Sequence, residues 1–391
     1  MAAGKVLLKR HKSIWIVSII VSLIFLAILL MLWFIINNRY VASVNQVSTA
    51  SEIKEKVVPF EKSDAGSIRT SQVYIIPTGI FIQSFEFIKS NTVQVSGYVW
   101  QKIDKKDLAK GVIPGVIFPE ASSMSNMKKA YEDDFGTYRL IGWHFFGVSL
   151  LQNFNYSSYP FDIQSIWIRM WPRDFSHYVI LIPDLESYVA TKPYTVFGLE
   201  SDIVKQGFEI KGTYFDMPIM HYDTSFGEPR KDLETNSLEL YFNIIIKRHL
   251  INAFLIHLLP ILVIWSILFA ITMIISNDKQ FAERVGLSTT QLFTALAGII
   301  FSVIIMNNNL RSNYFDQPFL YIEYFYLLTY AIIMLVSYDA YVITTKRKIQ
   351  NIFHHNLLPK TLFWPMILGC LIIITLFKFF IFPDDLMHWH R

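Results

Sequence analysis

The sequence predicts a membrane protein in which an all-β domain precedes a bundle of transmembrane helices. Hydrophobic residues make up 53% of the 391-residue chain, which is high for a water-soluble protein. Apolar runs long enough to cross a bilayer as helices occur once near the N-terminus and four times after residue 248. Between them, residues 71–248 form many short segments that read as strands.

The first apolar run predicts an uncleaved membrane anchor within residues 1–37. Basic residues precede it, and they favour a cytoplasmic N-terminus. The run covers residues 14–36, whereas a cleaved signal peptide has an apolar core of about 7–15 residues. A cleaved leader and a helix at the periphery of the bundle remain as alternatives. Residues 38–70 are polar and mixed in charge, so we expect a linker there.

Residues 71–248 predict an extracellular or periplasmic β-sandwich. Turn residues separate the apolar segments, and no long helical pattern interrupts them. The expected strands cover residues 73–76, 79–82, 85–88, 92–100, 112–118, 138–151, 164–170, 179–181, 208–215 and 238–246.

Residues 249–385 predict a domain of four transmembrane helices, at residues 250–275, 282–306, 319–343 and 362–382. With the N-terminus inside, the basic residues between 344 and 360 also fall inside, as the positive-inside rule requires. Residues 386–391 then form an external tail. We therefore expect a multi-pass plasma-membrane protein whose C-terminus is outside.

The second of these four runs is too polar in its first half for a helix that faces only lipid. Helical spacing places six residues on one stripe, with Glu283 at its entrance: Gly286, Thr290, Phe293, Ala297, Ile300 and Ile304. If several copies faced one axis, the stripe would form a charged ring, a hydroxyl ring and an apolar constriction, as in an ion pore. The alternative is a buried helix whose hydroxyls bond to neighbouring helices.

Several function classes find no support in the sequence. One cysteine, Cys370, excludes an intrachain disulfide and cysteine-rich metal sites. No nucleophile motif, phosphate-binding loop or metalloprotease motif occurs, so we expect no enzyme, no catalytic residue, no metal site and no cofactor. The net charge of +4 is small and forms no basic face, so we expect no nucleic-acid partner.

Four short motifs carry a family resemblance. They are Tyr159-Pro160-Phe161-Asp162 followed by Gln164, Arg248 before the second apolar run, Pro260 within that run, and Arg284-Val285-Gly286-Leu287 at the start of the polar run. Together with the layout, they resemble the pentameric ligand-gated ion channel family, the Cys-loop receptor superfamily. The likeness covers roughly residues 70–385. The absent disulfide and the short loop before the last helix are similar to prokaryotic members, so the bacterial inner membrane is the expected location.

The resemblance implies a homopentamer in the lipid bilayer that a small molecule or protons open to permeant ions. It also implies that six residues couple the β-domain to the helices: Tyr159, Pro160, Phe161, Asp162, Arg248 and Pro318. The alternative for Asp162 and Arg248 is a turn residue at a strand end and a cation at the membrane surface. A second function stays open, in which the chain is a non-conducting receptor or accessory subunit, because Phe301 is bulky for a pore.

Candidates for a ligand site are aromatic, because aromatic boxes bind cationic ligands through the ring quadrupole. They are Trp100, Tyr214, Phe215, Tyr222 and Phe226. The alternative for each is a place in the sandwich core or in an aromatic belt at the membrane surface. His257 lies inside an expected span and predicts either a proton sensor or a neutral residue bonded to another helix.

The entrance of the polar run gives conflicting indications of ion selectivity. Arg284-Val285-Gly286-Leu287 resembles the anion-selective receptors, whereas Glu283 before Arg284 resembles the cation-selective ones. Neighbouring residues on a helix point about 100° apart, so both side chains cannot face the axis. Five glutamates at a narrow mouth would attract cations, and we therefore expect cation selectivity with Phe293 as the hydrophobic gate.

Overall fold

The computed structural model describes residues 2–39, 45–61, 72–122, 127–192, 195–205, 207–224, 226, 235–275, 289–315, 317–345 and 356–381. The chain divides into two compact units. The helical unit consists of Met1–Tyr40, Asn155–Asp162 and His249–Arg391. The sandwich unit consists of Val41–Phe154 and Ile163–Arg248.

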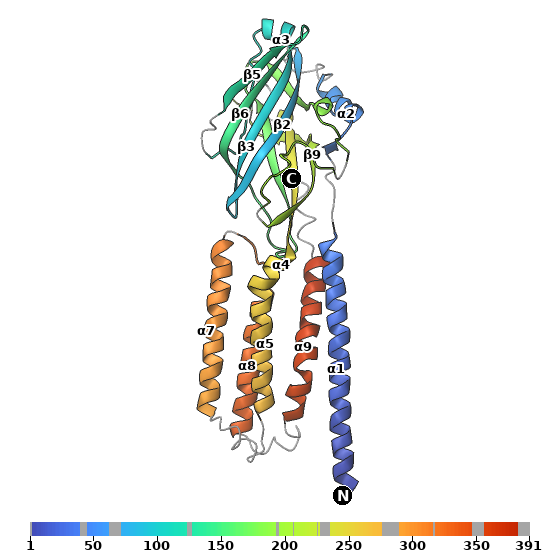
Figure 1. The fold of residues 1–391 in the computed structure, drawn as a ribbon, viewed down its shortest axis with the longest axis vertical. Coiled ribbons are helices and arrows are strands. Elements are labelled where there is room, and N and C mark those ends of the chain that lie inside the picture. Colours follow the sequence, from blue (N-terminus) through green and yellow to red (C-terminus); the bar gives the residue numbers. More distant parts are fainter. Residues whose placement is uncertain are drawn as a thin grey trace. The chain divides into compact units, whose positions relative to one another are not determined.

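The sandwich unit contains two five-stranded sheets and a hairpin (Figure 1). One sheet has the order β1 (Gln46–Val47), β9 (Phe208–Asp216), β12 (Leu240–Arg248), β7 (Ile163–Pro172), β4 (Val116–Ile117). The other has the order β5 (Lys128–Asp134), β6 (Tyr138–Leu151), β3 (Thr92–Asp104), β2 (Val73–Lys89), β8 (Tyr178–Pro183). Strands β10 (Ile219–Tyr222) and β11 (Thr235–Leu238) form the hairpin.

Alternation along the strands builds the core of the sandwich unit. In β7, every second residue from Gln164 to Met170 is buried and the residues between are half-buried. This pattern arises because successive side chains of a strand point to opposite faces of the sheet. Rings from three strands, Phe145, Phe215 and Phe242, are fully buried.

Parts of the sandwich unit differ from the sequence prediction. The expected linker contains β1 and α2 (Ala50–Glu61), and β1 pairs with β9. All seven residues of β5 are exposed, so the strand lacks the apolar alternation that would reveal it. The three strands expected between residues 73 and 88 form one strand, β2, which continues through irregularities in its pairing with β3.

The helical unit contains five helices that are long and apolar enough to cross a membrane. The first is α1 (Ala2–Asn37). The second is one continuous segment made of α4 (Leu250–Ala253), a π-helical turn (Phe254–Leu258) and α5 (Leu259–Ile274). The others are α7 (Thr289–Asn313), α8 (Glu323–Thr345), and α9 (Leu357–Leu376) with the π-helical turn that follows it (Phe377–Ile381). Pro260 stands near the start of α5, directly after the π-helical turn, where it has no N–H to donate to the preceding helical turn. Helix α7 extends to Asn313, into a segment expected to be a polar loop.

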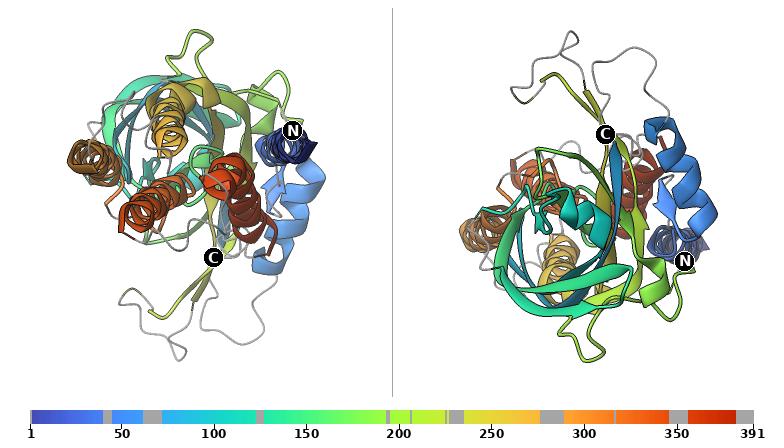
Figure 2. Two further views of the ribbon diagram at one scale, coloured as in Figure 1. Left: turned by 90° about the horizontal axis from the view of Figure 1, so that it is seen from below. Right: turned by 90° about the horizontal axis from the view of Figure 1, so that it is seen from above.

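Helix α1 packs along α9, and α7 lies on the opposite side of the helical unit (Figure 2). Among the residues of α1 that are not exposed, six recur at helical spacing: Ser18, Ser22, Phe25, Leu29, Trp33 and Ile36. A side chain at Gly369 of α9 would meet the Phe25 ring at 3.3 Å, so this glycine permits the close approach of the two helices.

Candidate functional site

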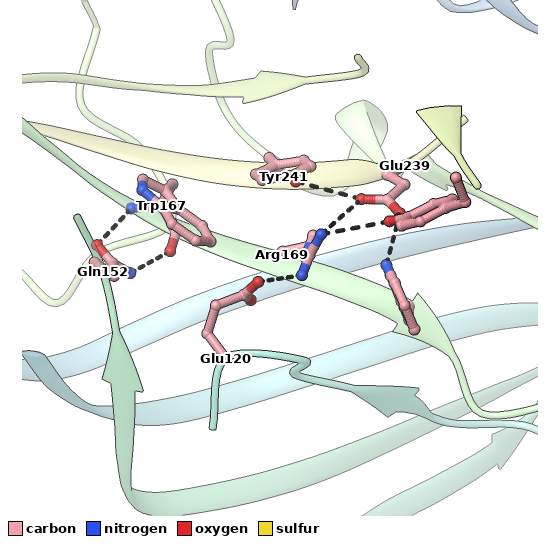
Figure 3. A network of polar contacts seen from close by, with 8 residues as sticks. Glu120, Gln152, Trp167, Arg169, Glu239 and Tyr241 are labelled. Atoms are coloured by element: carbon pink, nitrogen blue, oxygen red, sulfur yellow. Dashed lines mark hydrogen bonds and ion pairs between the residues drawn. The ribbon is translucent and has the colours of Figure 1, made fainter. Parts of the chain in front are cut away.

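A buried carboxylate, Glu239, accepts hydrogen bonds from several side chains near one end of β7 in the sandwich unit (Figure 3). Its side chain is 2% exposed. Trp171 Nε1 donates to Oε1 at 2.8 Å, the Tyr222 hydroxyl donates to the same oxygen, and the Tyr241 hydroxyl donates to Oε2 at 3.3 Å. These contacts give each oxygen of the buried carboxylate at least one hydrogen-bond donor, as a buried polar group needs.

Arg169 links Glu239 to a second carboxylate. Its Nη1 lies 3.5 Å from Glu239 Oε2, and its Nη2 forms an ion pair with Glu120 Oε1. Burial raises the pKa of Glu120, and the Arg169 charge partly offsets this rise. Burial also raises the pKa of Tyr222, and the hydrogen bond to Glu239 adds to the rise.

We call these six residues the Glu239 network: Glu120, Arg169, Trp171, Tyr222, Glu239 and Tyr241. With both carboxylates ionised, the network carries one net negative charge, which favours a cation nearby.

An aromatic rim lies beside the network. The rings of Trp171, Tyr222 and Phe226 contact one another edge to face, with centroids 5.3–6.0 Å apart. Phe226 is 56% exposed. The structure therefore brings together two of the residues expected from the sequence, Tyr222 and Phe226, and adds Trp171. The sequence analysis missed Trp171. The available signal was its position at the end of an alternating strand, just before the turn at Pro172.

The other three aromatic candidates lie elsewhere in the sandwich unit. Tyr214 and Phe215 are buried, and Phe215 packs against Phe242 and Phe197 in the core. Trp100 donates through Nε1 to Asp184 at 2.9 Å and packs 5.7 Å from Tyr188. These rings serve the core and a separate polar contact, and they do not join the rim.

The segment 155–162 follows β6 and precedes β7, yet its contacts place it in the helical unit. Its buried residues include Tyr159, Phe161 and Asp162. Local hydrogen bonds turn the backbone: Tyr159 N donates to Tyr156 O at 2.9 Å, and Phe161 N donates to Ser158 O at 2.8 Å. The Tyr159–Pro160 peptide is cis. We call residues 155–162 the aromatic loop.

One side of the aromatic loop meets the end of α7 and the π-helical turn before α5. Tyr156 and Tyr159 pack against Tyr314 with centroids 4.9 and 5.4 Å apart. Tyr159 also contacts the His257 ring edge to face at 5.7 Å, and His257 Nδ1 lies 3.4 Å from the Tyr326 hydroxyl. His257 is thus bonded to another helix, as one of its two sequence-based readings expects.

The other side of the aromatic loop meets α1, the start of α8 and the end of α9. Phe161 lies 5.8 Å from Trp33, 5.9 Å from Tyr321 and 6.1 Å from Phe379, centroid to centroid. Tyr321 N donates to Ser157 O at 2.9 Å. We call six residues the Tyr321 cluster: Trp33, Phe161, Tyr321, Phe325, Thr375 and Phe379.

The connection between α7 and α8 is fastened by an ion pair that the sequence analysis missed. Arg311 Nη1 lies 3.2 Å from Glu323 Oε2. The same guanidinium donates to the carbonyls of Gln317 at 3.0 Å and Pro318 at 3.4 Å. The expected coupling residue Pro318 therefore lies in a connection whose two flanking helices are joined by the Arg311–Glu323 ion pair.

The two charged coupling candidates belong to different units. Asp162 ends the aromatic loop and is 2% exposed. Arg248 ends β12 in the sandwich unit, where its guanidinium lies 4.7 Å from the centroid of the Phe208 ring. Their pairing stays a prediction.

Helix α7 turns one narrow side toward the rest of the helical unit. Its buried residues, Leu296, Val303 and Leu310, recur every seventh position. The expected pore residues Thr290, Phe293, Ala297 and Ile304 are exposed, and Ile300 is half-buried. Glu283 and Gly286 lie outside the described residues.

Within the described part of the chain, no cluster of three or more His, Cys, Asp or Glu side chains could hold a metal ion. Comparison of the whole chain with models of protein families, and with curated proteins, finds no match.

Proposed function

We propose that this chain is the subunit of a homopentameric, cation-selective ion channel that a small molecule or protons open. The proposal follows the resemblance to pentameric ligand-gated ion channels. It includes an extracellular or periplasmic sandwich, a four-helix channel domain and α1 as an additional helix. The observation that carries it is the exposed surface of α7.

Helices α1 and α7 expose different chemistry although both are poorly buried. Only 11% of the most apolar stretch of each helix is buried. The exposed residues of α1 are apolar, from Ile16 to Ile35, as lipid contact requires. Helix α7 exposes Thr290, Thr294, Gly298 and Ser302, small and hydroxyl residues that suit contact with other helices or a water-filled path.

The aromatic loop supplies the proposed route from ligand binding to the pore. It is covalently continuous with β6 and β7, and its tyrosines pack on Tyr314, which directly follows α7. A change in the sandwich would move the ends of the loop and bias two arrangements of α7. Asp162 and Arg248 are the proposed charged partners in this coupling.

The proposed ligand is a small cationic amine bound at the aromatic rim. Phe226 and Tyr222 supply aromatic rings, and the Glu239 network beside them contains two carboxylates and one guanidinium. Cations bind such faces with about 0.5–2 kcal/mol per ring. Selectivity among permeant ions is assigned to Glu283, and the hydrophobic gate to Phe293, with Thr290 beside it on the path.

Two measurements test assembly and conduction. Detergent-solubilised protein should have the mass of five 45.6-kDa chains by mass photometry. Purified protein in planar bilayers should carry a current whose reversal potential follows the cation gradient. Phe293→Ala should raise the open probability by widening the constriction, while Phe34→Ala on the lipid-facing side of α1 should leave it unchanged.

Several outcomes would contradict the proposal. A monomer or dimer would remove the pore, because one α7 cannot enclose a path. A reversal potential that follows chloride would refute cation selectivity. A pentamer without current at any pH from 4 to 9 would favour the non-conducting receptor, for which the exposed Phe301 is the supporting observation.

The coupling is tested by Asp162→Asn and Arg248→Gln. Both should weaken opening while leaving ligand binding largely intact, because neither residue belongs to the Glu239 network. Arg173→Gln, an exposed arginine of the sandwich unit, is the matched control. Unchanged gating in both variants would show that the coupling runs elsewhere.

A further inference from the structure

We propose that α1 is a positioning helix for the aromatic loop, and that Trp33 is the residue through which it acts. The inference rests on the proposed function only in giving that loop a part in gating. The placement of the loop itself is argued from contacts within the helical unit.

Trp33 reaches the loop in two ways. Its ring packs directly against Phe161 of the loop and, at 6.2 Å, against Phe325 of α8. Its Nε1 also donates to the Tyr321 hydroxyl at 2.9 Å. Tyr321 in turn holds the loop by its backbone, because its N–H donates to the Ser157 carbonyl.

The hydrogen bonds of the Tyr321 cluster run in one direction. The Thr375 hydroxyl donates its single proton to the Leu371 carbonyl at 2.7 Å. Its oxygen must therefore accept the proton of the Tyr321 hydroxyl, which lies 2.7 Å away. The Tyr321 oxygen is then left to accept from Trp33. Removing the indole N–H leaves this chain of bonds without its first donor.

Burial and hydrogen bonds show that the C-terminal part of α1 packs closely against the Tyr321 cluster. Tyr321 is 1% exposed and Phe379 is buried beside it, with ring centroids 5.0 Å apart. Arg39, just beyond α1, donates to the Phe379 carbonyl at 3.3 Å. Lower down, the Ser18 hydroxyl donates to the Thr361 carbonyl of α9. Hydrogen bonds from Ser18, near the middle of α1, and from Arg39, just beyond its C-terminal end, fix the register of α1 on α9 and the turn that follows it.

The physical consequence is local. Without Trp33, Phe161 loses one ring contact and Tyr321 loses one hydrogen bond. The loop can then separate more easily from the start of α8. The opposite wall, where Tyr159 packs on Tyr314 and His257, stays in place. On the α8 and α9 side the loop would keep only the contacts of Phe161 with Tyr321 and Phe379 and the backbone bond from Tyr321 to Ser157.

Hydrogen–deuterium exchange of the full-length protein in lipid nanodiscs tests this directly. The reporters are the amides of Ser157, Tyr159, Phe161 and Tyr321, whose hydrogen bonds shape or hold the loop. In Trp33→Ala these amides should exchange about tenfold faster, because two ring contacts and one hydrogen bond are lost. Trp33→Phe should show a rise of about threefold or less, since a ring remains.

Matched controls separate positioning from general destabilisation. Phe34→Ala removes an equally aromatic neighbour that is 69% exposed, and it should leave loop exchange unchanged. Amides of β2 and β3 should be unaffected in every variant. If Trp33→Ala does not fold, Tyr321→Phe removes the bond to Trp33 while it keeps the ring, and the Tyr321 amide should exchange faster.

Two results would overturn the inference: loop exchange in Trp33→Ala equal to that in Phe34→Ala, or a uniform acceleration that includes β2 and β3. Neither result depends on conduction. If the wild-type protein carries no current, the proposed function fails while the exchange data still decide whether α1 positions the loop.

Discussion

The Glu239 network of the sandwich unit and the Tyr321 cluster of the helical unit use similar parts to different effect. Both combine aromatic rings with hydrogen bonds among several elements. In the network Glu239 is buried and the other five residues are half-buried, whereas in the cluster every residue except the half-buried Trp33 is buried. The first contains three charged side chains, whereas none of the six members of the second is charged. Buried charges are costly to separate from their partners, while ring contacts can shift at small cost. We therefore expect the loss of a residue from the network to cost more free energy of unfolding than a loss from the cluster.

The largest effect is expected at the centre of the network. Arg169→Leu leaves Glu239 and Glu120 buried without their cation, and breaking a buried ion pair costs about 3–5 kcal/mol. Thermal unfolding of the solubilised protein, followed by tryptophan fluorescence, should show a large loss of stability. Arg173→Leu changes an exposed arginine and should have little effect. Equal losses in the two variants would break the comparison.

A smaller effect is expected in the cluster. Tyr321→Phe removes one hydroxyl that joins Trp33 to Thr375, and the loss of such buried bonds costs about 1–3 kcal/mol. The loss should be the same at pH 5 and pH 8, because no charged group belongs to the cluster. A loss as large as that of Arg169→Leu, or one that changes with pH, would contradict the neutral character assigned to this site.

The pH dependence of stability sharpens the contrast. Burial raises the pKa of Glu120, so the folded state holds this proton more tightly than the unfolded chain does. The contribution is present below the ordinary carboxyl pKa and is lost as pH rises through the raised value. Glu120→Gln should therefore flatten the decline of stability with rising pH in this window.

Glu132 provides a control of opposite sign. A hydrogen bond from Lys129 lowers the pKa of Glu132, so its contribution is present above the ordinary carboxyl pKa and is lost as pH falls. Glu132→Gln should leave the decline of stability with rising pH, which is assigned to Glu120, unchanged. An identical pH profile for Glu120→Gln and the wild type would show that Glu120 does not titrate with folding.

The smallest effect on stability is expected at the exposed edge of the rim. Phe226→Ala should change stability by less than about 0.5 kcal/mol, as exposed positions generally do. It should nevertheless weaken binding of tetramethylammonium, used as a probe, by roughly two- to fivefold, the value of an exposed cation–π contact. Isothermal titration of the solubilised protein measures this, and Phe146→Ala, an exposed ring of β6 away from the rim, is the control.

Repeating patterns made much of the fold predictable. Within the described residues, each of the five apolar runs contains a helix of membrane-spanning length. The strand β6 has the bounds that alternation indicated. Strand β5 could not be found, because its seven exposed residues carry no apolar signal. The expected linker hid α2 for a related reason: a short, mostly polar helix resembles a linker in composition.

The candidate sites were less predictable, because they depend on contacts between distant residues. Tyr222 and Phe226 were found because both are aromatic and close in sequence. Glu120, Arg169 and Glu239 each look like ordinary strand-edge charges, and only the sheet order joins them. Trp33 was read as part of an apolar anchor, since nothing local indicates that it meets Tyr321, which is 288 residues away.

The pairing of α1 with α9 also bears on how the chain is made. Helix α1 leaves the ribosome first, but its partner begins only at Leu357. At about 5–20 residues per second, α1 waits roughly 20–60 s in the membrane before α9 arrives. Thr375, the last hydroxyl in the chain of bonds from Trp33, is among the final described residues to be synthesised. The aromatic loop can therefore reach its final position only after Thr375 has been synthesised, more than 200 residues after the loop itself.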